Sequence, residues 1–206
     1  MLIETRKRIA NLISNILNPF LVSLVLILLL SFEATSNVLD ALRWSLILIV
    51  LSVLPVYLAI IYLVRSGRID NVFTNVRRQR TQIYLIAGGW AVVGCVVLLY
   101  LKAPPRLMAT SVAGLSTVVI FMCINLWWKI SLHTAFIAAL VTVLVILYGW
   151  VAAVTIALIP LISWARIELK RHSLAQVVAG ALLSTSIVAV VFGIFLPWYK
   201  FIYFVS

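Results

Sequence analysis

Long apolar segments that recur along the chain limit its fold more than any other feature. Five of them have about the length that a helix needs to cross the roughly 30 Å hydrocarbon core of a bilayer. They cover residues 12–32, 44–64, 83–101, 107–127 and 175–197. A chain of 206 residues that is 65% hydrophobic and only 10% charged cannot bury its apolar surface in one soluble core. The sequence therefore predicts an integral membrane protein.

One further apolar stretch, residues 134–165, is too long for a single crossing, and "YGW" at 148–150 interrupts it. Two short helices, 132–148 and 151–168, fit this stretch better and bring the total to seven spans. Backbone groups in lipid must be hydrogen-bonded within the segment, and the alternating pattern of a membrane barrel is absent. We therefore expect an all-α, polytopic membrane helical bundle of six or seven transmembrane helices, forming a single domain over residues 1–206.

Basic residues divide unevenly between the two ends of these spans. Seven spans place twelve of the 16 Lys and Arg residues on one side and four on the other. The positive-inside rule makes the richer side cytoplasmic, which predicts a cytoplasmic N-terminus in an inner or plasma membrane. The formal net charge of +11 is then explained by the bilayer as partner rather than by nucleic acid. The twelve are Arg6, Lys7, Arg8, Arg65, Arg68, Arg77, Arg78, Arg80, Lys129, Arg166, Lys170 and Arg171, and the four are Arg43, Lys102, Arg106 and Lys200.

Small residues inside the spans predict close helix packing. They are the pair Gly88 and Gly89, and Gly180 together with Ser184. No cysteine or histidine spacing predicts a metal site. The spans also lack the buried ionisable side chains that mark a transport path, which disfavours a transporter or channel.

Three polar clusters fall on the predicted cytoplasmic face: "NVRRQRTQ" at 75–82, "WKISLH" at 128–133, and "WARIELKRHSLAQVVAG" at 164–180. One helical hairpin separates each cluster from the next, so the three can converge. Both histidines of the chain, His133 and His172, lie in them. A cluster of Arg and His suits phosphoryl transfer, because Arg binds phosphate oxygens while one His attacks phosphorus and another protonates the leaving oxygen. The simpler interpretation, for basic residues such as Lys170 and Arg171, is anchoring at the membrane interface.

Two of these clusters resemble motifs of the type 2 phosphatidic-acid phosphatase superfamily, whose pattern is Lys-x6-Arg-Pro, then Pro-Ser-Gly-His, then Ser-Arg-x5-His-x3-Asp. Ser131 and His133 fit the second motif, and Arg166 and His172 fit the third at its spacing. The first motif is weak, since only Arg80 fits it. The resemblance covers a phosphatase-like core of about residues 70–195, and the N-terminal helical pair, about 12–64, carries none of it.

The resemblance implies a metal-independent phosphatase of lipid phosphates or isoprenoid diphosphates that needs no cofactor and acts through a phosphohistidine. It makes His172 the nucleophile and His133 the general acid. The residues that would hold the phosphate are Arg166, Ser131, Lys129, Arg80 and Arg77.

The main departure from the family is Gln176, which stands where the family has the Asp that orients the nucleophilic His. Gln can accept the same hydrogen bond without the charge, but its amide can also flip and favour the other tautomer. Loss of the corresponding carboxylate in Ser-His-Asp proteases lowers the rate by about 10⁴. Glu168, four residues before His172, is an alternative carboxylate unless it pairs with Arg171 or Lys170. The competing function is therefore a non-catalytic relative that binds lipid phosphate or serves as a structural subunit.

Overall fold

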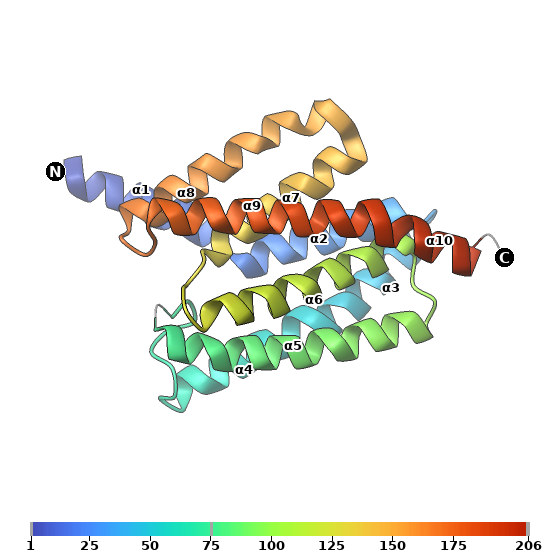
Figure 1. The fold of residues 1–206 in the computed structure, drawn as a ribbon, viewed down its shortest axis with the longest axis horizontal. Coiled ribbons are helices and arrows are strands. Elements are labelled where there is room, and N and C mark those ends of the chain that lie inside the picture. Colours follow the sequence, from blue (N-terminus) through green and yellow to red (C-terminus); the bar gives the residue numbers. More distant parts are fainter. Residues whose placement is uncertain (1, 75, 205–206) are drawn as a thin grey trace. The chain divides into compact units, whose positions relative to one another are not determined.

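The computed structural model describes residues 2–74 and 76–204, and every regular element within them is a helix (Figure 1). The all-α class expected from the sequence is confirmed. Two short π-helical segments and one 3-10 segment interrupt the α-helices. The elements are α1 (Leu2–Ile16), α2 (Pro19–Ala34), α3 (Val38–Leu48), η1 (Ile49–Val53), α4 (Leu54–Arg65), α5 (Arg77–Tyr100), α6 (Pro105–Asn125), α7 (Leu132–Tyr148), η2 (Gly149–Ala157), α8 (Leu158–Glu168), α9 (Leu174–Val190), η3 (Val191–Phe195) and α10 (Leu196–Phe204).

Five continuous helical stretches are long and apolar enough to cross a membrane, and a bent α1–α2 pair makes a sixth. At most 39% of the most apolar window of any of the five is buried. The remaining apolar side chains need lipid around them, so the chain is a polytopic integral membrane protein. The sequence-based count of seven treats α7 and α8 as two crossings. Length and composition alone count their stretch, Leu132–Glu168, once, although the chain reverses direction within it (Figure 1).

The chain forms two compact units. The first contains the residues up to Ser23 together with Lys129–Ala189, which are α1, the first turn of α2, the hairpin of α7 and α8, and nearly all of α9. Helix α7 ends at Tyr148, and Gly149 adopts a φ of 63° at the point where the chain turns back through η2 into α8 (Figure 1). The reversal lies at the "YGW" break that the sequence indicates. Both ends of this hairpin carry residues of the predicted site.

The sequence predicts one helix over residues 12–32 for the first span, and this prediction is wrong. Helix α1 already begins at Leu2, and the axis bends by 41° between α1 and α2. The cause is local. Pro19 disfavours a helical conformation in the preceding residue, and Asn18 caps the next helix by accepting the N–H groups of Phe20 and Leu21 at 3.0 and 3.1 Å. The charged residues of α1 therefore belong to a helix that is separate from α2.

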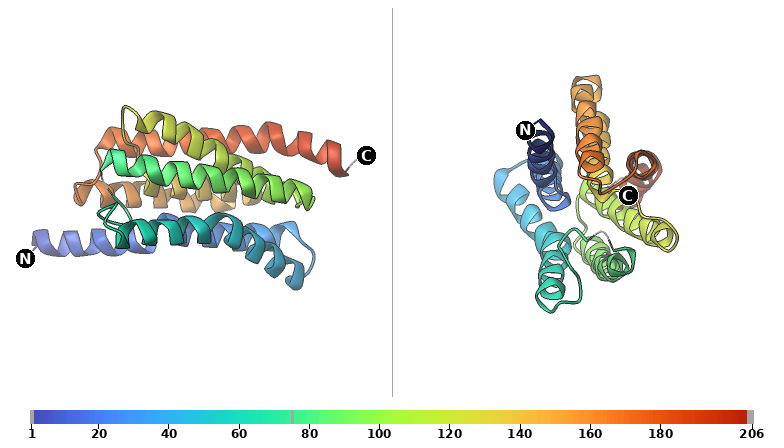
Figure 2. Two further views of the ribbon diagram at one scale, coloured as in Figure 1. Left: turned by 90° about the horizontal axis from the view of Figure 1, so that it is seen from below. Right: turned by 90° about the vertical axis from the view of Figure 1, so that its left-hand side faces the viewer.

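The second unit contains Leu24–Trp128 and the residues from Val190 onward. Within it α5 and α6 pack side by side as an antiparallel pair (Figure 2). Lys102, with a φ of 51°, ends α5, and the Ala103 N–H closes the turn on the Leu98 carbonyl at 2.9 Å. The buried Tyr199 hydroxyl donates to the Ala103 carbonyl at 3.1 Å, which fixes α10 to this turn.

Candidate functional site

A tight turn at the end of α8 determines the separation of Arg166 and His172. Lys170 adopts the left-handed conformation (φ 52°), its N–H donates to the Ile167 carbonyl at 2.8 Å, and the Arg171 N–H donates to the Arg166 carbonyl at 3.0 Å. These two bonds form a Schellman motif, the common way to satisfy the last carbonyls of a helix. The His172 N–H also donates to the Arg166 carbonyl, at 3.3 Å. The five residues between Arg166 and His172 thus form this turn, which brings the His172 backbone back to the Arg166 carbonyl.

Helix α9 begins with a capping box made by Ser173 and Gln176. The Gln176 side-chain oxygen accepts the Ser173 N–H at 3.2 Å, and the Ser173 hydroxyl accepts the Gln176 N–H at 3.4 Å. Such reciprocal bonds satisfy two backbone donors that the first turn of a helix would otherwise leave unpaired. Gln176 therefore has a local structural role that is independent of its position relative to the histidine.

The same oxygen, Gln176 Oε1, lies 3.0 Å from His172 Nδ1. A flipped amide would direct its NH₂ group at the Ser173 N–H, which is also a donor, so the capping box selects the orientation with the oxygen toward both groups. An oxygen can only accept, and His172 must then donate from Nδ1. This tautomer places the ring's lone pair on Nε2. The amide flip expected as a risk of having Gln at this position is thus opposed by a backbone N–H.

The start of α7 carries the second histidine and contacts α9 closely. Ser131 is the N-cap of α7, as the sequence predicts, and its hydroxyl accepts the Thr134 N–H at 3.4 Å. The Ser131 N–H donates to the Gln176 carbonyl at 3.2 Å. A Cβ built on Gly180 would lie 2.8 Å from the Ser131 carbonyl oxygen, so the two backbones approach more closely than any side chain would permit. The expected close packing is confirmed at Gly180.

His133 lies in the first turn of α7 and is only 3% exposed, while Ser131 is fully buried. His172 and Gln176 are half-buried, and Lys129 precedes α7 in a connecting segment. The structure thus brings two of the three predicted clusters into one unit, 164–180 entirely and 128–133 from Lys129 onward. Backbone hydrogen bonds form within cluster 164–180 and also connect it to cluster 128–133.

Helix α1, which the resemblance does not cover, supplies hydrogen-bond partners to two charged side chains at the end of α8, Arg166 and Glu168. The Arg166 Nη1 donates to the Ser14 hydroxyl at 2.8 Å, and both residues are buried. Arg6 forms an ion pair with Glu168, with 2.7 Å between Nη2 and Oε2. Glu168 therefore pairs with neither Lys170 nor Arg171, and its bond to Arg6 corrects the hypothesis that it serves as a carboxylate for His172. Sequence patterns give no signal for these pairs, because their members are 152 and 162 residues apart.

Arg77 and Arg80, predicted to bind phosphate, belong to the second unit. There the Arg77 Nη1 donates to the Trp127 carbonyl at 2.7 Å. Arg80 is buried, donates to the Tyr84 hydroxyl at 3.0 Å and lies over the Tyr84 ring. Each thus has a bond that stabilises the start of α5. Gly89 is also in α5, and a Cβ there would meet no atom within 4 Å, so the close packing expected at this glycine is wrong.

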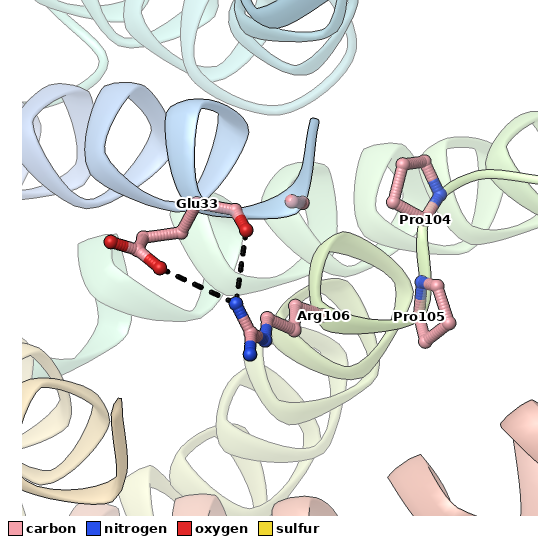
Figure 3. A pocket seen from close by; sticks show the side chains of 5 residues that line it. Glu33, Pro104, Pro105 and Arg106 are labelled. Carbon is pink, nitrogen blue, oxygen red and sulfur yellow. Dashed lines mark hydrogen bonds and ion pairs between the residues drawn. The ribbon is translucent and has the colours of Figure 1, made fainter. Parts of the chain in front are cut away.

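The second unit also has a shallow recess of about 280 Å³, lined by Glu33, Ala34, Pro104, Pro105 and Arg106 (Figure 3). Arg106 Nη1 donates to the Glu33 carbonyl at 2.9 Å and lies 3.4 Å from the Glu33 carboxylate. These bonds join the end of α2 to the start of α6. The charged side chains of the recess, Glu33 and Arg106, therefore form an ion pair with a structural role.

No group of three His, Cys, Asp or Glu side chains in the described part of the chain is arranged to hold a metal ion. No family model, curated protein or solved structure matches the chain. The functional interpretation accordingly depends on the arrangement around His172 and His133.

Proposed function

We propose that this integral membrane protein is a divergent member of the type 2 phosphatidic-acid phosphatase superfamily. Its substrates would be lipid phosphates or isoprenoid diphosphates, and its site would face the cytoplasm. The observation that carries the proposal is the contact between His172 Nδ1 and Gln176 Oε1, with the amide held by the Ser173 N–H. A nucleophilic histidine needs its lone pair on the nitrogen that attacks, and this contact supports a lone pair on Nε2.

The reaction has two steps that share one pair of histidines. The His172 Nε2 lone pair forms a bond to phosphorus while the bond from phosphorus to the leaving oxygen breaks, and protonated His133 gives its proton to that oxygen. Neutral His133 then takes a proton from water, whose oxygen attacks the phosphohistidine, and inorganic phosphate leaves as His172 regains its lone pair. Arg166 and Lys129 would stabilise the negative charge on the non-bridging oxygens, with the N-terminus of α7 as a further source of donors.

The neutral Gln176 has a defined cost in this scheme. Phosphorylation of Nε2 turns His172 into a cation, and an amide oxygen stabilises that cation less than a carboxylate does. We therefore expect turnover to be slow. Gln176→Glu keeps the length of the side chain and adds the missing charge, so it should raise phosphate release by about 10-fold or more. Gln176→Met keeps the length but removes the acceptor, and it should lower the rate.

The test is release of inorganic phosphate from dioctanoyl phosphatidic acid and farnesyl diphosphate by the detergent-purified protein. The wild type is compared with His172→Ala, His133→Ala and the two Gln176 variants. Substrate carrying ³²P at phosphorus should leave an acid-labile label on the wild type that His172→Ala lacks. Release that persists in His172→Ala would overturn the mechanism.

A non-catalytic lipid-phosphate binder is the second candidate, favoured by the absence of a carboxylate next to His172 Nδ1 in the capping box. It predicts that the wild type binds dioctanoyl phosphatidic acid but releases no phosphate, and that Gln176→Glu gains release. Release by the wild type at a rate that His172→Ala abolishes would exclude it.

Orientation has a separate test, in a protein whose two native cysteines are replaced. Arg68 lies in the segment between α4 and α5 and is exposed, so Arg68→Cys places a reactive thiol there. With this segment in the cytoplasm, an impermeant thiol reagent should label it only after the cells are opened. Labelling in intact cells would reverse the proposed sidedness.

A further inference from the structure

Three residues of α1 form one stripe along the helix because they are spaced four apart. They are Arg6, Ala10 and Ser14, and each faces α8 or is buried: Arg6 pairs with Glu168, Ser14 with Arg166, and Ala10 is fully buried between them. The small side chain at Ala10 lets the two helices approach. Helix α1 therefore contacts the site by a specific face.

We propose that Ser14 is a positioning residue of the phosphate site that acts through Arg166. This inference depends on the proposed function in so far as it takes Arg166 to be the phosphate-binding arginine. The Ser14 hydroxyl accepts one N–H of the guanidinium at 2.8 Å, and the two residues are 4% and 6% exposed. A long Arg side chain loses much rotamer freedom when it binds an anion, and a residue that already holds it lowers that loss.

The chemistry of the contact fits positioning better than charge neutralisation. A serine hydroxyl is neutral, so it orients the guanidinium without cancelling the charge that a phosphate needs. A guanidinium has five N–H donors in a planar fork, and Ser14 takes one of them. The nearest carboxylate along α8, Glu168, is bonded instead to Arg6 of the same α1 face. Helix α1 thus gives Arg166 a neutral partner and gives Glu168 a cationic one.

The orientation of Arg166 also bears on the nucleophile. The Arg166 carbonyl accepts the N–H groups of Arg171 and His172, so one residue presents its side chain to α1 and its backbone to His172. Without Ser14 the Arg166 side chain would have to be ordered by the phosphate itself, which weakens binding, while the backbone bond from His172 to Arg166 stays in place. Ser14 should therefore affect substrate binding first and the chemical step less.

The test compares Ser14→Ala, Ser14→Thr and Ser23→Ala. Ser23 is the matched control, because it lies in the next helix and its hydroxyl donates to the Pro19 carbonyl. Binding of dioctanoyl phosphatidic acid is measured in the His172→Ala background, where turnover does not interfere. KM and kcat for phosphate release are measured with His172 present.

We expect Ser14→Ala to weaken binding and raise KM by about 10-fold, the equivalent of one lost orienting hydrogen bond, with kcat changed by less than about 3-fold. Ser14→Thr, which keeps the hydroxyl, should stay within about 3-fold of the wild type. Ser23→Ala should match the wild type. With Arg166→Ala present, Ser14→Ala should have no further effect, because the two residues act as one unit.

The outcomes separate this inference from the proposed function. Unchanged binding and KM in Ser14→Ala, or an equal loss with and without Arg166, would overturn the inference while leaving a measured phosphatase activity in place. Binding that depends on Ser14 in a protein that releases no phosphate would uphold the inference and reject the enzyme. A wild type that neither binds nor hydrolyses the lipid would reject both.

Discussion

Gly180 offers a direct test of the close approach between α9 and the start of α7. In Gly180→Ala the new Cβ would lie 2.8 Å from the Ser131 carbonyl oxygen and 3.1 Å from Ile130 Cγ2. The first of these atoms cannot rotate away, because the same carbonyl accepts the Ala135 N–H at 3.1 Å in the first turn of α7. One backbone has to move relative to the other.

Two opposing terms set the size of the effect. Overpacking of a tight contact costs about 1–3 kcal/mol. Alanine in place of glycine inside a helix returns about 0.5–1 kcal/mol. The net loss is up to about 2.5 kcal/mol, which for a chain of 206 residues lowers the melting temperature by up to roughly 10 °C. The proposed release of phosphate should fall as well, because Ser131 caps the helix that carries His133.

Gly89→Ala is the matched control, since it makes the same change in a helix where the added Cβ meets no atom within 4 Å. It should raise the melting temperature by about 1–3 °C. The assay is loss of circular dichroism at 222 nm on heating in detergent, at one scan rate for all variants because membrane proteins often unfold irreversibly. A Gly180→Ala protein at least as stable as Gly89→Ala would refute the close approach.

Three smaller changes test the turn, the cap and the ion pair of the first unit. Lys170→Gly should stabilise the protein by about 1 kcal/mol, because glycine adopts the left-handed conformation without the steric cost that lysine pays; a melting temperature that falls would contradict the Schellman turn. Ser173→Ala removes the hydroxyl that caps α9 and should cost about 0.5–1 kcal/mol in thermal unfolding, and an unchanged value would argue against the capping box. A double-mutant cycle of Glu168→Gln and Arg6→Gln should give a coupling energy below about 1 kcal/mol for this ion pair. Glu168→Gln should also leave the pH profile of the proposed phosphate release unaltered. A shifted profile would restore Glu168 as a partner of His172.

Helix positions follow from the apolar runs because lipid demands about 20 apolar residues whatever the tertiary packing. The span expected at 107–127 is α6, Pro105–Asn125, and the break at 148–150 is where α7 ends. Apolar length does not indicate where α1 begins, because the first turns of this helix are charged. The bend after α1 does have a sequence signal, since Asn18-Pro19 is a dipeptide typical of turns.

The site was predictable to the extent that its geometry is local. Ser131 as an N-cap follows from its place just before an apolar run. The pairing of Gln176 with His172 was expected from their four-residue spacing, although His172 lies before the cap of α9 and not inside the helix. The capping box of Ser173 and Gln176 follows the pattern Ser-x-x-Gln and was present in the sequence. The turn at Lys170 was hidden, because the usual signal is glycine. The Ser14–Arg166 bond was hidden for a different reason, since it depends on how two distant helices pack.

The bonds from α1 to α8 also constrain the order in which the protein can fold. Arg6 and Ser14 leave the ribosome before their partners, Glu168 and Arg166, which are 162 and 152 residues later in the chain. During synthesis α1 must therefore remain at the membrane without its final contacts while most of the protein is inserted. Completion of the site is then among the last steps of assembly. Replacing Arg6 and Ser14 by alanine would leave every apolar segment intact and still remove both bonds that complete this step.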